Sequence, residues 1–347
     1  MKLCETQKTG KDNKGQMKTR MLIEFFAMCA AVFLLTVLIL RRLIPVLKSH
    51  KIGQKIYDIG PRWHKGKEGT PIMGGVGFII PSLLAFAVLA AVYAALGRAA
   101  ELIPAALTMG LAVLNGLIGF FDDYTKLIKK QNEGFLAWQK FSLQLVVAGL
   151  YLWAMTVCGC IDTTLALPFC DISLELGVGY YVIAILLITG MVNGVNLTDG
   201  IDGLSSSVTA VVGAFFAVAA FSKEMPELSV LAATVIGGTV GFLMYNFYPA
   251  KVFMGDTGSL YLGGIVVGMA FMLGEPLIIL SAGFVYICEI ASDILQVGYF
   301  KLTHGKRLFK MAPIHHHFEK CGWSEVKIVA VFTVAAVIFC VISWFGI

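Results

Sequence analysis

Charge is scarce in this sequence. Of its 347 residues, 14% are charged and 58% are hydrophobic, whereas soluble globular domains carry about 25% charged residues. So little charge beside so many apolar residues excludes intrinsic disorder and argues against a single soluble domain. The composition therefore predicts an integral membrane protein.

Cysteine spacing typical of metal sites and internal repeats are also missing. Eight cysteines are present, but Cys158 and Cys160 form a C-x-C pair with no matching pair elsewhere. A zinc site is therefore not expected, and most cysteines are interpreted as apolar filling in helices. No period of about 20–50 residues repeats, which excludes a solenoid or repeat array.

Long apolar runs, in contrast, are abundant. A transmembrane helix takes roughly 20 residues, and ten runs of about this length occur along the chain. They predict an all-α, polytopic membrane protein in which residues 21–347 form a single transmembrane domain. The predicted spans are residues 21–40, 72–96, 102–121, 137–158, 177–196, 203–221, 228–247, 257–274, 276–300 and 326–346.

The basic residues separate the loops into two sets. One alternating set of loops and adjacent helix ends carries 19 Lys and Arg, whereas the opposite loops carry only Arg98 and Lys223. Because basic loops stay in the cytoplasm, the first set is predicted to be cytoplasmic and both termini extracytoplasmic. Residues 1–20 carry six more basic residues, and we expect them to form a disordered polar tail.

An aspartate pair marks one of the predicted cytoplasmic boundaries. Asp122 and Asp123 directly follow an apolar run, and Lys126 comes three residues later. Mg2+ prefers hard oxygen ligands and commonly binds one or two carboxylates together with phosphates and water. The pair indicates either a metal and phosphate site, with Lys126 as a phosphate clamp, or simply a helix leaving the membrane.

A second polar group, residues 196–203, interrupts two apolar runs on the same predicted side. Asn196, Asp199 and Asp202 stand there among glycines that include Gly200. Glycine permits positive φ and close backbone approach, so such a loop can fold around a ligand and present N–H groups. A simple turn does not need these three polar residues, and a ligand-binding loop is the favoured interpretation.

A third group surrounds Asp256, which lies among Gly, Thr and Ser just before a predicted span. Thr257, Ser259 or Asp256 itself can cap the helix that follows. A helix N-terminus is also a natural anion site, so capping and binding are compatible here.

The fourth group, residues 311–319, contains His315, His316 and His317 in a row. Consecutive residues of a helix point about 100° apart, so one rigid helix does not direct all three at one metal. In a loop they can donate hydrogen bonds to phosphates and gain charge beside an anion. A structural role in a turn stays open for one or two of them.

Two further acids, Glu289 and Asp293, fall inside a predicted span with a spacing of four residues. They share one helical face, and carboxylates within a membrane are functional candidates by default. The alternative is a helix that leaves the bilayer early.

Taken together, these segments resemble the phospho-MurNAc-pentapeptide translocases, the MraY family of the polyprenyl-phosphate N-acetylhexosamine-1-phosphate transferase superfamily. The double aspartate is common to the superfamily, whereas residues 311–319 are much more specific to this family. Ile72 departs from the pattern, which commonly has Thr there, and so does the basic tail. The matching segments are residues 69–75, 122–123, 196–203, 253–264 and 311–319.

The resemblance implies a reaction. Phospho-MurNAc-pentapeptide would pass from UDP-MurNAc-pentapeptide to undecaprenyl phosphate, giving lipid I and UMP, with Mg2+ as cofactor. The enzyme would be a homodimer in the bacterial inner (cytoplasmic) membrane, with its active site on the cytoplasmic face and no nucleic-acid partner. Alternatives are a related transferase that uses another UDP-sugar, or a cation- or proton-coupled transporter. Transporters favour repeats with broken helices at mid-membrane, whereas these acids gather at one face.

The resemblance also implies roles for individual residues. Asp256 would be the main Mg2+ ligand, with Asp122 and Asp123 near the metal and the lipid phosphate. Asp122 is the usual candidate base, but a phosphate monoester is largely ionised at neutral pH, which favours a positioning or electrostatic role. Phe253 would stack on uracil, as aromatic rings do on nucleobases. The implied catalytic residues are Asp122, Asp123, Asp256 and His316. The implied substrate-binding residues are Lys67, Lys126 and Lys140 at phosphates, and Asn196, Asp199, Gly200, Asp202, Asn246, Phe253, Gln296, His315, His316 and His317.

Overall fold

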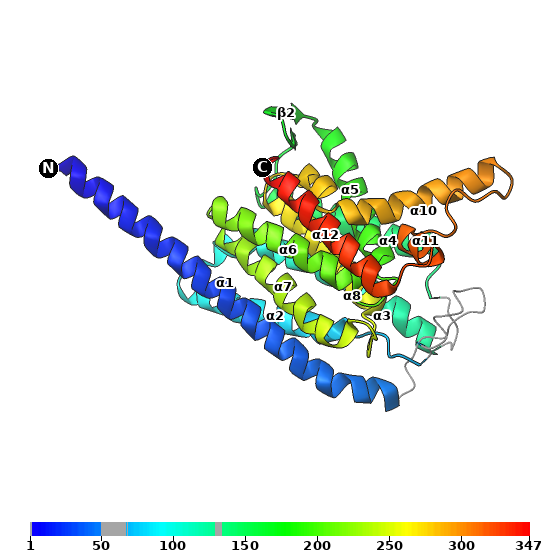
Figure 1. Cartoon of the computed structure of the whole chain (residues 1–347). Helices are drawn as coiled ribbons and strands as arrows, with labels where there is room; N and C mark the ends of the chain where they lie inside the picture. The colour runs from blue at the N-terminus through cyan, green and yellow to red at the C-terminus, as the bar shows by residue number, and fades with distance from the viewer. Residues whose placement is uncertain (1, 50–66, 68, 129–133) are drawn as a thin grey trace.

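The computed structural model describes residues 2–49, 67, 69–128 and 134–347, with backbone alone at 2–15 and 17, and is almost entirely helical (Figure 1). A single hairpin pairs β1 with β2, antiparallel, in the register Thr164↔Glu175. The elements are α1 (Lys2–Ser49), α2 (Val76–Ala95), η2 (Ala99–Leu102), α3 (Ile103–Ile128), α4 (Ala137–Val157), β1 (Thr164–Leu167), β2 (Ile172–Glu175), α5 (Val178–Thr198), α6 (Leu204–Ser222), α7 (Pro226–Asn246), α8 (Gly255–Met272), η3 (Pro276–Ile278), α9 (Ile279–Ala282), α10 (Phe284–Leu302), α11 (Ile314–Lys320) and α12 (Glu325–Trp344).

Each of the ten predicted spans coincides with helix. Among the described residues, eight helices are long and apolar enough to cross a membrane, or nine if one bent pair is a single span. The remaining predicted span is α8, whose residues from Thr257 onward are buried inside the bundle. The chain is therefore a multi-pass membrane protein, as the composition predicts.

Two features of the helices go beyond what the sequence indicated. Residues 276–300 do not form one straight span, because Pro276–Ala282 and Phe284–Leu302 meet at 81°. The break is at Gly283, whose φ of −95° is not helical and which is a poor helix former. The tail, expected to be disordered, continues α1 outward from the bundle (Figure 1). Extending a formed helix costs less than nucleating one, and the tail's Lys and Gln favour helix.

The loops gather at two ends of the bundle. At one end, Gly346 packs against Phe169 of the β1–β2 turn, and Lys18 of α1 pairs with Glu224 of the α6–α7 loop at 3.5 Å. The acidic ends of α3 and α8 lie at the other end (Figure 1). These described segments therefore lie at opposite ends of the bundle, and the cytoplasmic assignment of the acidic end stays a prediction.

Helices α3 and α8 approach each other closely because small residues line their contact. A Cβ added at Gly264 would lie 2.9 Å from the Cα of Ala112, and one at Gly268 would lie 2.5 Å from Thr108. A Cβ at Gly119 would collide with the backbone carbonyl of Asp256. Small residues are what allow helix backbones to touch in membrane proteins. This contact brings the end of α3 to the start of α8.

We predict that Gly119→Ala lowers the free energy of unfolding by about 1–3 kcal/mol, because the added methyl group meets backbone that cannot yield. Thermal unfolding in detergent measures the change. Gly110→Ala on the same helix is the matched control, since its Cβ meets no neighbouring segment within 4 Å. It should leave stability unchanged or raise it by up to about 1 kcal/mol. Equal melting temperatures for the two variants would contradict the close contact.

Candidate active site

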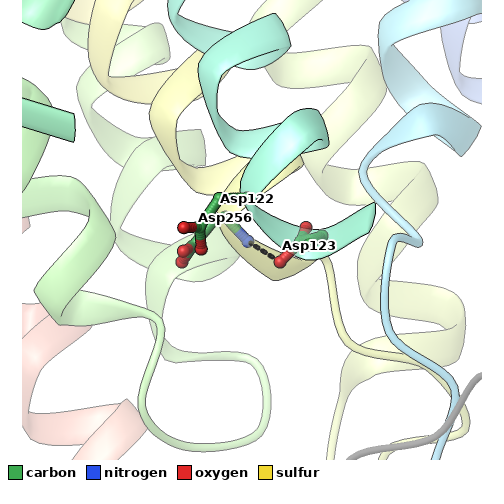
Figure 2. Close-up of side chains that lie close together, drawn as sticks. All are labelled: Asp122, Asp123 and Asp256. Atoms are coloured by element: carbon green, nitrogen blue, oxygen red, sulfur yellow. Dashed lines mark hydrogen bonds between the residues drawn. The ribbon is translucent and has the colours of Figure 1, made fainter. Parts of the chain in front are cut away.

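Three carboxyl groups meet where α3 ends and α8 begins. Asp122 and Asp123 come from the last turns of α3, and Asp256 comes from the first turn of α8. One carboxylate oxygen from each lies within 4.8 Å of the other two, the only such acidic, His or Cys group among the described residues. In Figure 2 the carboxyl groups of Asp122 and Asp256 lie together, with Asp123 beside the start of α8.

Two lysines offset this negative charge. The Lys126 Nζ lies 2.6 Å from Asp122 Oδ2 and 3.0 Å from Asp256 Oδ2. The Lys140 Nζ, from the first turn of α4, lies 2.9 Å from the same Asp256 oxygen. Burial raises the pKa of Asp256, but the charge of Lys140, a hydrogen bond with Asp122 and the charge of Lys126 together hold that pKa well below its usual value. Asp256 is therefore an anion.

Asp123 caps α8 from a different helix. Its Oδ2 accepts hydrogen bonds from the Thr257 N–H at 3.0 Å and the Thr257 hydroxyl at 2.7 Å. Its Oδ1 accepts the Asp256 N–H at 3.3 Å, the bond drawn in Figure 2. We expected Thr257, Ser259 or Asp256 to cap the helix, and that expectation is wrong. The α3–α8 contact places an outside carboxylate on the free N–H groups, while the Ser259 hydroxyl donates to the Gly255 carbonyl at 3.0 Å.

Neighbouring groups fix the other two carboxylates. The Asn196 amide, at the end of α5, donates to Asp256 Oδ1 and to the Ser259 hydroxyl, both at 2.8 Å. The Phe135 N–H donates to Asp122 Oδ1 at 2.6 Å. Asn196, expected in the substrate pocket, therefore lies against the acidic cluster and orients Asp256.

The cluster suits a divalent cation. Mg2+ takes oxygen ligands at about 2.1 Å in an octahedron, so its ligands lie within about 4.2 Å of one another. Oxygens already within 4.8 Å need only a small side-chain rotation to meet that limit. Asp122 and Asp256 are the better candidates, because the Oδ2 atom of each pairs with flexible lysine side chains, whereas both Asp123 oxygens accept N–H groups of the α8 backbone.

A second set of polar residues ties the neighbouring loops together. Asp202 Oδ2 accepts the Ala250 N–H at 2.8 Å. Asn246 accepts the Gly203 N–H at 3.1 Å and donates to the Val252 carbonyl at 3.0 Å. The side chains of Asp202 and Asn246, both expected to bind substrate, are buried. Their hydrogen bonds link residues 199–203 to residues 247–254.

Phe253 and Asp199 also lie at these loops. The Phe253 N–H donates to the Pro71 carbonyl at 2.8 Å, and its ring is half-buried. Burial raises the pKa of Asp199 well above its usual value, and the negative charges of Asp256, Asp123 and Asp202 raise it further. The Asp199 carboxyl is therefore influenced by the charges of the carboxylate cluster and by that of Asp202.

Lys67 does not join the other two predicted phosphate lysines. Its Nζ lies 2.7 Å from Asp202 Oδ1 and 2.6 Å from Glu325 Oε2, at the start of α12. Lys126 and Lys140 instead lie on Asp256. Lys67 therefore lies apart from the acidic cluster. Its partner Glu325 is a residue that the sequence patterns did not single out.

The three histidines have three different partners on the short helix α11. His315 Nδ1 lies 2.9 Å from Glu289 Oε2, with both side chains buried. His316 Nδ1 lies 2.5 Å from Glu319 Oε2. His317 Nδ1 accepts the Lys310 N–H at 3.1 Å.

Two further contacts connect this region to the loops. Gly200 faces the ring of His315, because a Cβ there would collide with His315 Nε2. Gln296 accepts the Phe309 N–H at 2.8 Å and the Leu308 N–H at 3.1 Å. The i,i+3 spacing of His316 and Glu319 on a helix was a signal for their pairing, whereas nothing local indicated Glu289–His315.

Comparison with known proteins identifies the family of this chain. The profile of Glycosyl transferase family 4 matches residues 105–274. A phospho-N-acetylmuramoyl-pentapeptide-transferase of Clostridium acetobutylicum is 44% identical over 302 residues, 87% of this chain and 92% of the relative. One from Clostridium novyi is 45% identical over 87% of this chain and 90% of the relative. One from Listeria monocytogenes is 39% identical over 94% of this chain and 98% of the relative. The chain belongs to the phospho-N-acetylmuramoyl-pentapeptide-transferase family.

Proposed function

We propose that the protein transfers phospho-MurNAc-pentapeptide from UDP-MurNAc-pentapeptide to undecaprenyl phosphate, giving lipid I and UMP. The observation that carries the proposal is the group of three aspartates and two lysines at one end of a membrane-spanning bundle. Membership of the family supports the choice of substrates. The basic loops support a location in the bacterial cytoplasmic membrane with the site facing the cytoplasm, and homodimerisation stays a prediction.

The reaction brings anions together. An oxygen of the lipid phosphate forms a bond to the sugar-linked phosphorus of the donor, and the bond from that phosphorus to the bridging oxygen breaks. UMP leaves with the bridging oxygen and its electron pair. Several negative charges converge in this step, so cations must offset their repulsion. Mg2+, when bound, supplies part of that compensation.

The residues of this chain supply the rest. Asp256, held by Asn196, and Asp122 would provide oxygen ligands for the cation. Asp123 holds the start of α8 against α3 and so positions Asp256. Lys126 and Lys140 pair with these carboxylates, and with Mg2+ on the carboxylates their ammonium groups would be available to the phosphates. Because the acceptor phosphate is already ionised, Asp122 acts by its position and charge rather than by removing a proton.

The test of the function is formation of UMP and lipid I by purified protein supplied with both substrates and Mg2+. We predict that Asp256→Asn lowers turnover at least about 100-fold and abolishes Mn2+ binding measured by electron paramagnetic resonance. Asp171→Asn, in the exposed hairpin turn at the other end of the molecule, is the control and should keep both. Folded wild-type protein that releases no UMP would refute the proposal.

Lys140→Gln should separate metal binding from turnover. The Lys140 ammonium competes with a metal for Asp256 Oδ2, so its removal should tighten Mn2+ binding at least about fivefold. Turnover should fall, because a phosphate clamp is lost. A variant with weaker Mn2+ binding, or with normal turnover, would remove Lys140 from this role.

His316→Ala should lower turnover about 100-fold, since His316 is the half-buried histidine paired with the buried Glu319 carboxylate and a positioned proton donor or acceptor contributes about this much. His304→Ala, an exposed histidine in the loop after α10, is the matched control. Initial rates at saturating substrates measure both. Wild-type rates for His316→Ala would leave the histidine with a structural role in α11.

A further inference from the structure

We infer that Glu325 is a positioning residue for the donor substrate, acting through Lys67 and the loop of residues 199–203. The inference rests on the proposed function, because that loop and Lys67 are expected to meet UDP-MurNAc-pentapeptide. Glu325 lies outside every motif that carries the family resemblance. Its role follows from three contacts at the start of α12.

The first two contacts hold one ammonium group between two acids. Lys67 Nζ lies 2.6 Å from Glu325 Oε2 and 2.7 Å from Asp202 Oδ1. The side chain of Lys67 is 16% exposed, that of Glu325 10% and that of Asp202 1%. At such burial, removal of one partner leaves a poorly compensated charge, so the geometry of the three groups is strongly determined.

The third contact reaches the backbone of the loop itself. The Asp202 N–H donates to the same Glu325 oxygen at 3.1 Å. Asp202 in turn accepts the Ala250 N–H, and Asn246 accepts the N–H of Gly203. One carboxylate of α12 therefore fixes the position of Lys67 and the end of the loop that carries Asp199 and Gly200.

An ammonium group has three N–H donors, and Lys67 directs two of them at Glu325 and Asp202. Among the described residues no acceptor takes the third, which can donate to an acceptor atom of a ligand. Glu325 thereby fixes the direction of the Lys67 ammonium group and leaves it able to donate to a ligand. Without Glu325 the flexible lysine side chain keeps a single ion-pair partner and loses a defined direction.

A purely structural role at the start of α12 is the competing interpretation. Acidic residues in the first turn of a helix favour the helix dipole, and Ser324 already caps α12 by accepting the Lys327 N–H at 3.3 Å. A helix-starting role predicts lower stability and equal losses with both substrates. A positioning role predicts a loss that is specific to the donor.

The experiment measures steady-state kinetics of Glu325→Ala and Glu325→Gln with each substrate varied in turn. For Glu325→Ala we expect KM for UDP-MurNAc-pentapeptide to rise at least about tenfold, with kcat and KM for undecaprenyl phosphate within about threefold of wild type. Glu325→Gln keeps an acceptor for the Asp202 N–H and should show a smaller rise. Glu101→Ala, which removes the ion pair with Arg98 on the opposite end, should match wild type.

A double-mutant cycle with Lys67→Met tests whether Glu325 acts through Lys67. Residues that act through one another give less than additive losses, so Lys67→Met/Glu325→Ala should raise the donor KM little beyond Lys67→Met alone. Additive losses, an unchanged donor KM, or equal losses for both substrates with a lower melting temperature would each overturn the inference. If Glu325→Ala does not fold, the donor KM of Glu325→Gln decides. Inactive wild-type protein would instead refute the proposed function.

Discussion

The backbone contact between α3 and α8 is the constraint on which the rest of the site depends. With glycine at position 119, the end of α3 lies against the Asp256 carbonyl. Asp123 can then cap α8 from outside, accepting both the backbone N–H and the hydroxyl of Thr257. This one packing arrangement delivers three carboxyl groups to the same few ångströms, and it does so from rigid helices, which hold a site more firmly than loops do.

Three carboxylates this close would repel one another strongly without compensation. Lys126 and Lys140 supply it, and both pair with the same Asp256 oxygen, while the Asn196 amide satisfies the other. With all groups ionised, the five charges sum to about −1, and a bound divalent cation would make the site net positive. A site of that sign attracts a phosphate and a diphosphate, which is what the proposed reaction requires.

The sequence predicted the helices and most of the polar groups, but not how those groups pair. Apolar runs determine where helices form, and basic residues indicate on which side of the membrane a loop lies. Both properties can be predicted from short stretches of sequence. Pairings such as Asp123 with Thr257, 134 positions apart, and Lys67 with Glu325, 258 apart, depend on packing that no local pattern encodes. For the same reason no local pattern indicated that the Asn246 amide would hydrogen-bond the backbone at both ends.

The two halves of the site are mechanically joined through the segment before α8. Residues 247–254 are held to the loop of residues 199–203 by Asp202 and Asn246, and they lead directly into Asp256. The same segment pairs with the turn before α2, since Gly74 and Gly75 donate to the carbonyls of Phe253 and Met254. A displacement of the loop of residues 199–203 must therefore move the start of α8, and with it the carboxylate cluster. The loop of residues 199–203, where we propose that the donor binds, and the carboxylate cluster are consequently joined by one connected set of hydrogen bonds, with Glu325 bound to the Asp202 N–H at its far end.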